Sequence, residues 1–183
     1  MKLLRTLTLA GIWLLSTQVL AGESIAVDYQ FTGDTGVNLG AAAGGPIRIN
    51  EFSDARNIEN KADIVHSGKE SLTLSAQSPS ALVREAFTKS FAASGAVMGE
   101  DGGLVVNGKL IEMQVEESAD GIEVLIRCEL SLSNQGRNAW QSTLFSRTTT
   151  SGDDVAAAIS ASLDRLVSEL FMDDYFLMEL GIF

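Results

Sequence analysis

The segment from Gly121 to Ser133 constrains the fold more than any other part of the sequence. Its apolar residues alternate with mostly polar ones, and this two-residue period is typical of a β-strand with one buried face. Such a strand is stable only when a second layer covers its apolar side. The chain must therefore provide a layer that covers Ile122, Val124, Ile126, Cys128, Leu130 and Leu132.

A further strand is predicted on each side of this segment. The first runs from Lys109 to Glu116, and Ala119-Asp120-Gly121 joins it to the central strand with the Asp-Gly pair of a β-hairpin. On the other side, Asn134-Gln135-Gly136 turns the chain into a strand from Trp140 to Thr149. The pattern predicts an antiparallel meander with one face open to water. On the first strand, the buried face would carry Ile111, Met113 and Val115.

One amphipathic helix is predicted before the meander. Ser78 is a suitable N-cap, Pro79 a suitable first helical residue, and Gly95 a suitable residue after the helix end. Apolar side chains four residues apart form one stripe that would face the core. The stripe consists of Val83, Phe87 and Phe91.

A second helix is predicted after the meander. Ser151-Gly152-Asp153-Asp154 resembles a capping box with an acidic first turn. An apolar tail, Tyr175–Phe183, ends the chain, and Asp173-Asp174 would lie near the helix C-terminus, where carboxylates are mildly unfavourable. The apolar stripe of this helix consists of Val155, Ile159, Leu163, Leu166, Val167 and Leu170.

Three more strands are predicted in the N-terminal half, over 24–31, 46–50 and 71–74. Residues 40–46 are small and lack the Gly-Lys-Ser/Thr of a phosphate loop, so we expect a linker there. Helices with one apolar stripe each, beside a sheet with one apolar face, predict an α+β fold. The expected architecture is a two-layer sandwich, with a mainly antiparallel sheet and two amphipathic helices packed on one face.

The first residues have the three parts of a cleavable secretory signal peptide. Lys2 and Arg5 form a basic region, Leu7–Leu15 an apolar region, and Val19 and Ala21 the residues before the cleavage site. The apolar stretch is short for a membrane-spanning helix, which needs about 20 residues. We therefore predict cleavage after Ala21 and a periplasmic location.

The residues around this cleavage site also bear on lipid attachment. Leu20-Ala21-Gly22-Glu23 resembles a bacterial lipobox in which Glu23 replaces the acylated cysteine. A carboxylate cannot form the thioether to a lipid, so no lipid anchor is expected. The predicted organisation is a signal peptide over residues 1–21 and a single α+β domain over residues 22–183.

The charge of the chain excludes some classes of partner. The formal net charge is −11, and removal of the signal would make it −13. This acidity opposes binding to nucleic acid and to anionic lipid head groups, both of which require clustered Lys and Arg. With Cys128 as the single cysteine, the chain forms no intramolecular disulfide.

Candidates for catalysis and metal binding are few. His66, the single histidine, lies in a polar stretch with Asp63 and Ser67, and we interpret it as a loop histidine because proximity in sequence does not make a Ser-His-Asp triad. Cys128 is expected to be an inert core residue. Neither Asp153-Asp154 nor Asp173-Asp174 has the spacing of a calcium loop. We predict no catalytic, cofactor-binding or metal-binding residues.

The order of several short segments along the chain is informative. These segments are Ile25–Tyr29, Ile47–Ile49 with Asp54–Arg56, Val83–Gly95, Ile122–Leu132, Trp140, and the last helix with Asp173-Asp174. In this order the chain resembles the YajG-like family of bacterial envelope lipoproteins. The resemblance spans nearly all of the mature chain, although Glu23 stands where the family carries its cysteine. It implies an envelope accessory domain with no known catalytic residues.

These observations lead to one functional expectation and two alternatives. We expect a non-enzymatic, soluble periplasmic protein that acts by protein–protein contact with another envelope protein. The contact surface would be an exposed sheet edge or the tail Tyr175–Phe183. The first alternative is a small-ligand-binding module with an apolar pocket between helices and sheet. The second, less favoured, is a hydrolase that uses His66.

Overall fold

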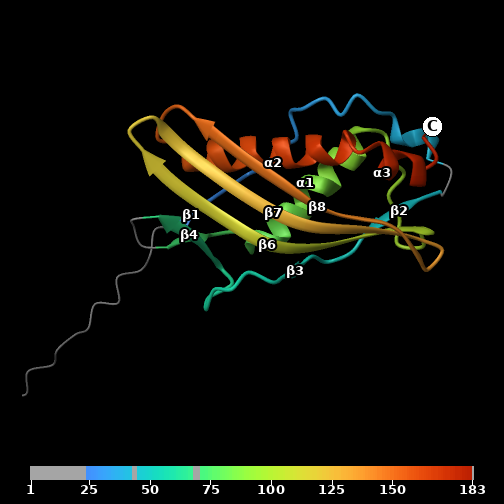
Figure 1. Cartoon of the computed structure of the whole chain (residues 1–183), viewed down its shortest axis with the longest axis horizontal. Helices are drawn as coiled ribbons and strands as arrows, with labels where there is room; N and C mark the ends of the chain where they lie inside the picture. The colour runs from blue at the N-terminus through green and yellow to red at the C-terminus, as the bar shows by residue number, and fades with distance from the viewer. Residues whose placement is uncertain (1–23, 43–44, 68–70, 183) are drawn as a thin grey trace, which may run out of the picture.

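The computed structural model describes residues 24–42, 45–67 and 71–182, and it shows a curved sheet with helices packed on its inner face (Figure 1). Three long strands dominate the sheet: β6 (Leu104–Ser118), β7 (Gly121–Asn134) and β8 (Arg137–Thr150). They pair antiparallel in sequence order, so the predicted meander is confirmed. The six alternating apolar side chains of β7 are all at most 2% exposed.

The side-chain alternation of β6 differs from the prediction at one position. In its pairing with β7, Ile111 is an extra residue between Leu110 and Glu112, which makes a β-bulge. An extra residue reverses the alternation that follows it. Leu110 and Met113 are therefore buried, whereas Ile111 is only half-buried and lies outside the core.

Three short strands pair with the other long side of β6, and all three run parallel to it. β2 (Ile47–Ile49), β3 (Ser53–Asp54) and β4 (Asp63–Ser67) pair with successive stretches of β6. β5 (Leu72–Leu74) then pairs antiparallel with β4, and β1 (Ser24–Ile25) pairs parallel with β5. The strand order β1-β5-β4-β6-β7-β8 leaves β8 at one edge of the sheet.

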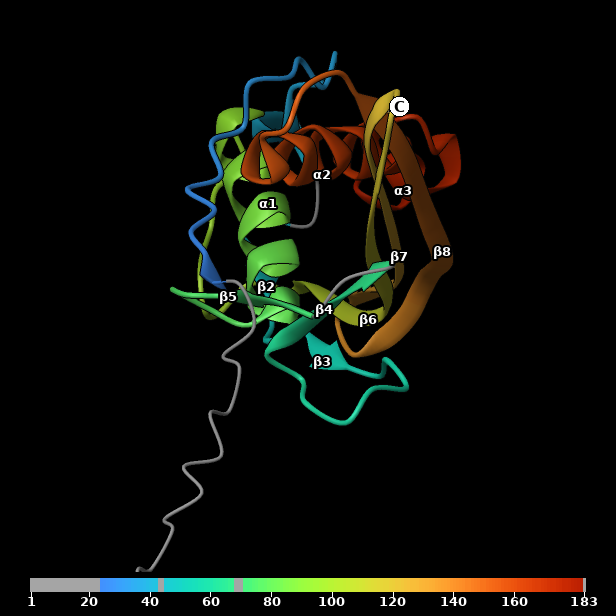
Figure 2. The ribbon, with the colours of Figure 1, turned by 90° about the vertical axis from the view of Figure 1, so that its left-hand side faces the viewer.

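The prediction of a strand over residues 24–31 is wrong beyond the first two residues, which form β1. Val27 and Tyr29 are buried in the expected alternation, but this segment runs over the helices without pairing to a strand (Figure 2). The hydroxyl of Tyr29 donates to Asp164 Oδ1 at 2.7 Å, and Lys89 Nζ donates to the Tyr29 carbonyl at 2.5 Å. The alternation therefore indicates which side chains are buried, and not where the backbone pairs.

The two predicted helices are α1 (Pro79–Ala93) and α2 (Val155–Phe171), and they cross on the same face of the sheet (Figure 2). Ser78 Oγ accepts from Ala81 N at 3.2 Å, which confirms the predicted N-cap of α1. Gly95 follows the end of α1 with φ +85°, a conformation that favours glycine. Both predicted stripes are buried apart from Val155, which is half-buried; the buried members are Val83, Phe87 and Phe91 of α1 and Ile159, Leu163, Leu166, Val167 and Leu170 of α2.

The N-terminus of α2 differs in detail from the predicted capping box. Asp154 is the N-cap, and its Oδ1 accepts from Ala157 N at 3.0 Å. Because the helix begins at Val155, the two aspartates precede the first turn and Ser151 lies too far upstream to cap it. The helix thus begins with a carboxylate at its positive end, as expected on electrostatic grounds.

The small-residue segment predicted as a linker begins inside a short 3-10 helix, η1 (Leu39–Ala41). Asn38 Oδ1 accepts from Gly40 N at 2.9 Å and so caps this helix. Leu39 is buried, and its N–H donates to the Ser94 carbonyl at the end of α1. This contact attaches the N-terminal segment to the helical layer.

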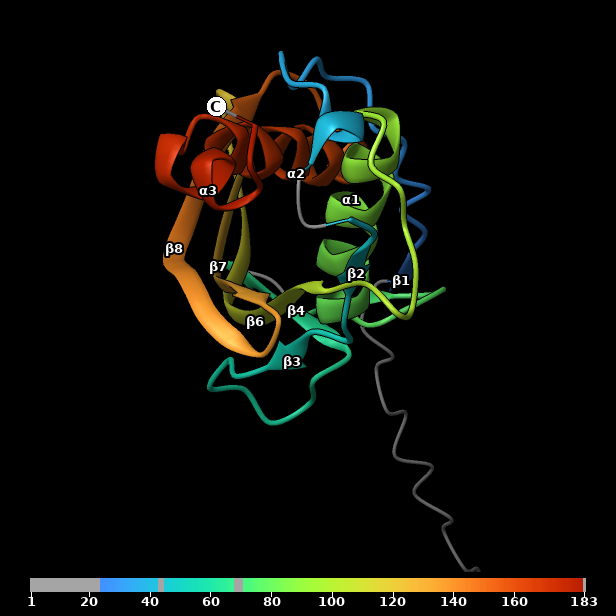
Figure 3. The ribbon, with the colours of Figure 1, turned by 90° about the vertical axis from the view of Figure 1, so that its right-hand side faces the viewer.

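A third helix, α3 (Asp174–Glu179), follows α2 and packs beside the start of β8 (Figure 3). Phe176 of α3 is fully buried, with its ring centre 4.9 Å from that of Trp140 on β8 and 6.1 Å from that of Phe91 on α1. The architecture is the predicted α+β sandwich of a mainly antiparallel sheet and two amphipathic helices. Within the described residues, no helix combines the length and hydropathy needed to cross a membrane.

Candidate functional site

His66 is not in a loop, as the sequence suggested, but in strand β4. Successive side chains of a strand point to opposite faces, and here His66 is buried while Ser67 on one side is exposed. His66 Nε2 lies 3.2 Å from Glu117 Oε1. Asp63 also points to the outer face, where its Oδ1 accepts from the Thr73 hydroxyl at 2.8 Å. The strand therefore separates the imidazole from both residues that a triad would need.

Cys128 lies at the centre of β7, opposite Leu110 on β6 and Leu144 on β8. Its side chain is fully buried. Burial raises the pKa of its thiol to about 12, because the thiolate would lose its hydration. A nucleophilic cysteine needs the opposite combination of exposure and a lowered pKa. The geometry supports the prediction that Cys128 is an inert core residue.

The pair Asp173-Asp174 has a structural role that the sequence reading missed. We predicted it near a helix C-terminus, but a new helix begins there: Asp173 is the N-cap of α3, and its Oδ1 accepts from Phe176 N at 3.0 Å. Its Oδ2 accepts from Trp140 Nε1 at 3.1 Å. Over the described ranges, no three His, Cys, Asp or Glu side chains are grouped as metal ligands would be.

Strand β8 stands out because it is a long strand at the edge of the sheet. It has 14 residues, and β7 is its only strand partner within the described part of the chain. Alternate N–H and C=O groups of an edge strand point away from its partner, so they are free to pair with another chain. The strands at the opposite border have two to five residues each. The two borders of the sheet therefore differ sharply.

A groove of about 790 Å³ lies between this free edge and α2. One wall is formed by residues of β8 between Ser142 and Thr148, and the other by Arg165, Glu169 and Met172 of α2 and its C-cap. Sequence reasoning missed the groove because its walls are about 20 residues apart in the chain and meet only in the folded sheet.

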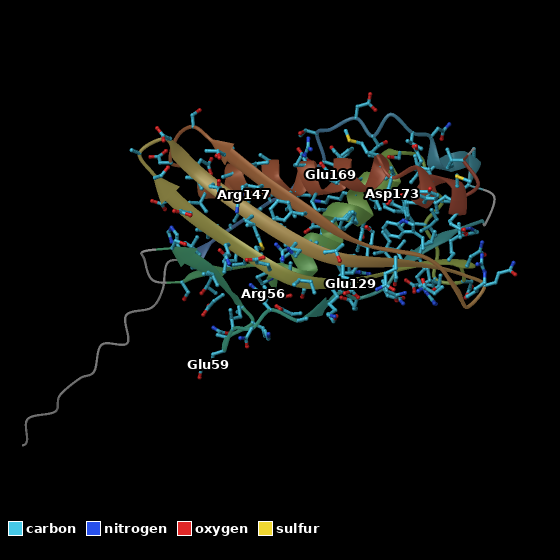
Figure 4. The ribbon with its side chains drawn as sticks, in the orientation of Figure 1. Arg56, Glu59, Glu129, Arg147, Glu169 and Asp173 are labelled. Atoms are coloured by element: carbon cyan, nitrogen blue, oxygen red, sulfur yellow. The ribbon has the colours of Figure 1, made fainter. Side chains whose placement is uncertain are left out.

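The two walls of the groove run in opposite directions. Trp140, near the start of β8, bonds to Asp173 after the end of α2. Further along the strand, the hydroxyls of Ser146 and Ser162 lie 2.8 Å apart. This pairing places Arg147 toward the Arg165 end of the groove, and Figure 4 shows Arg147 at a distance from Glu169 and Asp173. Arg147 and Asp173 thus lie toward opposite ends of the groove, and Arg165 and Glu169 between them form an i,i+4 ion pair.

Large apolar side chains are exposed beside the groove. Phe145, on the outer face of β8, is flanked by Arg127 and Arg147, whose guanidinium carbons lie 5.6 and 5.9 Å from its ring centre. Met172 lines the groove, and Tyr175 on α3 is 76% exposed. Aromatic residues, methionine and arginine are the residue types enriched at protein–protein interfaces.

We refer to Phe145, Met172, Tyr175 and Met178 together as the apolar rim. Met178 is exposed and lies three residues after Tyr175, on the same side of α3. Three other apolar side chains of the tail, Phe176, Leu177 and Leu180, are buried in the core. The tail that the sequence offered as a contact surface therefore contributes only part of its apolar side chains to the surface.

Comparison with known proteins identifies the fold but no family. No protein-family model matches the chain, and a search of curated proteins finds no significant match. Among solved structures, a Xanthomonas campestris protein of the DUF330 family is similar with a TM-score of 0.64 and 15% identity. The likeness covers 81% of this chain and 92% of that protein.

Two further solved structures are similar at lower scores. Protein CT253 from Chlamydia trachomatis has a TM-score of 0.51 and 10% identity, over 76% of this chain and 98% of that protein. A minor lipoprotein from Acinetobacter baumannii has a TM-score of 0.37 and 10% identity, over 75% of this chain and 94% of its own. The first two likenesses show that bacterial proteins share this fold. The resemblance to the YajG-like family stays a prediction.

Proposed function

We propose that this protein is a non-enzymatic component of the bacterial cell envelope that acts in the periplasm by binding another envelope protein. The observation that carries the proposal is the free edge of β8, bordered by the groove and the apolar rim. Edge strands and exposed apolar side chains favour protein association, and proteins that do not use them usually protect them. The periplasmic location rests on the signal predicted over residues 1–21, which lies outside the described residues.

The alternatives have less support. The groove is lined by charged side chains, including Arg147, Arg165 and Glu169, whereas small-molecule pockets are mostly apolar. A hydrolase would need His66 beside a nucleophile, but β4 places Ser67 on the opposite face. Binding of a protein through the β8 edge accounts for the unpaired edge strand and the apolar rim, and neither alternative does so.

Affinity purification after chemical crosslinking in intact cells tests the proposal. The tagged wild-type protein is compared with a Met172→Glu/Tyr175→Glu variant, which places two charges in the apolar rim. The control is Val97→Glu/Ala157→Glu, which changes the charge equally at two exposed positions outside it. We expect one envelope protein to copurify with wild type and control but not with the rim variant. Equal recovery with all three, or no envelope partner with wild type, would contradict the proposal.

A further inference from the structure

Most of the free edge of β8 lacks the usual protection of an edge strand. Such edges are commonly blocked by charged side chains, above all lysine, by proline, by β-bulges, by short length or by a covering element. β8 contains neither lysine nor proline and is 14 residues long; its bulge at Ala139 and its Arg137 lie near its start, and α2 packs on its inner face rather than across its edge. The opposite border of the sheet, by contrast, is built of very short strands. The edge is thus suited to accept an added strand.

The groove also offers an extended chain apolar contacts and an unused polar group. A strand paired to β8 would lie against α2 and contact Leu144 and Met172. Thr148 Oγ1, in the same groove, is buried and has no hydrogen-bond partner among the described residues. A buried hydroxyl without a partner is unfavourable, and a polar group of an added chain would relieve it.

The charges of the groove indicate the chemistry of such a chain. Arg147 and Arg165 have more than half of their side chains exposed, at 56% and 54%. Each arginine already has one acidic neighbour: Arg165 pairs with Glu169 on the same helix, and Arg147 Nε lies 3.5 Å from Glu123 Oε1. A guanidinium has five N–H donors, so complementarity would place a carboxylate of the added chain against the exposed donors of the two arginines.

A second copy of this chain fits the edge less well. Each copy has a formal net charge of −11, so two copies repel each other over long range. Pairing of β8 with the opposite border of another copy would match 14 residues with strands of two or three. Pairing of two β8 edges would match in length but would hold two acidic molecules side by side. The occupant that we favour is therefore a segment of a different polypeptide, and pairing of two β8 edges is an outcome of the test below.

We propose that β8 binds an extended segment of its partner as an additional β-strand, with an acidic side chain of that segment placed against Arg147 and Arg165. Main-chain hydrogen bonds to the edge would supply affinity, and the groove would select alternate side chains. This inference rests on the proposed function and specifies how the partner is recognised.

A displayed library of random peptides of about ten residues, the upper length of common strands, provides the probe. We expect selection on the purified protein to enrich peptides with alternating apolar residues and an acidic residue toward one end. In the synthetic versions, N-methylation of one alternate set of amides should abolish binding, while methylation of the other set should leave it. This pattern follows because only every second amide of an added strand points to its neighbour.

The charge preference is tested with two matched variants. Arg165→Glu should weaken binding of the acidic peptides by about tenfold and favour peptides with lysine at that position. Lys109→Glu is an equal change in charge at a 45% exposed side chain on the outer face of β6. It should change neither the affinity for the acidic peptides nor the preference for an acidic residue. The proposal would be overturned if the two variants changed peptide binding equally, or if N-methylation of either set of amides left binding intact. It would also be overturned if selection enriched no peptide, or if the protein associated with itself through β8. If an envelope partner is nevertheless recovered from cells, strand addition fails while the proposed function stands.

Discussion

The indole Nε1 of Trp140 donates a hydrogen bond to Oδ2 of Asp173 at 3.1 Å. The bond joins the edge strand β8 to the junction between α2 and α3, at the end of the groove that Asp173 lines. Asp173 Oδ1 also caps α3 by accepting from Phe176 N. One carboxylate therefore fixes both walls of the groove and the helix that carries much of the apolar rim.

Substitution of this carboxylate should be costly. Asp173→Ala removes the cap of α3 and leaves the Trp140 Nε1–H without its acceptor, so we expect a loss of about 2–3 kcal/mol in the free energy of unfolding. Asp174→Ala, at the neighbouring exposed residue, should change it by about 0.5 kcal/mol or less. Urea denaturation followed by tryptophan fluorescence measures both. Similar values for the two variants would show that Asp173 does not have this role.

Tyr29 should attach the N-terminal segment to α2. Tyr29→Phe removes its hydrogen bond to Asp164 and should cost about 1.5 kcal/mol, near the lower limit for a bond to a charged group, because Thr32 Oγ1 still donates to Asp164 Oδ2 at 3.0 Å. Thr32→Val, which removes only the exposed bond, should cost less. Hydrogen exchange should show the largest loss of protection between Val27 and Thr32.

The same residue predicts a dependence on alkaline pH. Burial, and after it the hydrogen bond and charge of Asp164, raise the pKa of Tyr29 above its usual value. The tyrosine would then ionise in the unfolded chain above about pH 10 but stay protonated in the folded protein. Its contribution to stability is complete below that pH and is lost as the pH rises. The difference in stability between wild type and Tyr29→Phe should therefore shrink above pH 10.

Asp54 and Arg56 form a buried ion pair that should weaken in acid. Burial alone raises the pKa of Asp54, but the hydrogen bonds and charge of Arg56 lower it overall below its usual value. Arg56 Nη2 lies 2.6 Å from Asp54 Oδ2, and its side chain is 2% exposed. Asp54→Asn leaves this guanidinium without its counter-charge and should cost about 3 kcal/mol at neutral pH.

The sign of the pH effect follows from that lowered pKa. A carboxylate with a lowered pKa stabilises the fold above its unfolded value of about 4, and the stabilisation is lost as the pH falls through the folded value. The cost of Asp54→Asn should thus decrease between pH 6 and pH 3. Glu59→Gln, at an exposed residue of the loop that follows β3 (Figure 4), should cost little at any pH. A cost of Asp54→Asn that is constant with pH would contradict the assigned ion pair.

Cys128 should resist thiol reagents in the folded protein. With its pKa raised to about 12 by burial, the thiolate fraction at pH 8 is about three orders of magnitude below that of a free cysteine. Native protein should therefore react with a maleimide only as fast as it unfolds, and addition of urea should restore rapid labelling. Complete labelling of the native protein within minutes would show that the thiol is accessible.

Periodicity, together with the turn and helix-end residues, was sufficient to predict the meander, the helical layer and the core of β7, because regular alternation reports burial directly. It failed where pairing partners decide the structure. Residues 24–31 alternate but pack on helices, and β4 was missed because its five residues are mostly polar. Ile111 was misplaced because a bulge leaves no mark in a pattern of two-residue period.

The candidate site was less accessible to sequence reasoning. An exposed sheet edge was expected, but the sequence did not show which strand forms it. That depends on the order of strands in the sheet, and this order is determined by pairings between distant segments, such as that of β4 with β6. The sequence of the apolar tail did not show that Phe176 is buried and Tyr175 exposed, because the burial of each side chain depends on where α3 begins. Asp173, which sets this start, had no interpretable signal in the sequence.

Site-specific photo-crosslinking in cells tests the central claim most directly. A photoreactive phenylalanine analogue replaces Phe145 on the β8 edge or, as a control, Val65 on β4; the native side chains are 42% and 38% exposed. The account predicts that position 145 forms an adduct with a single envelope protein and that position 65 does not. An adduct of that protein at position 65 but not at position 145, or no adduct at either, would contradict it.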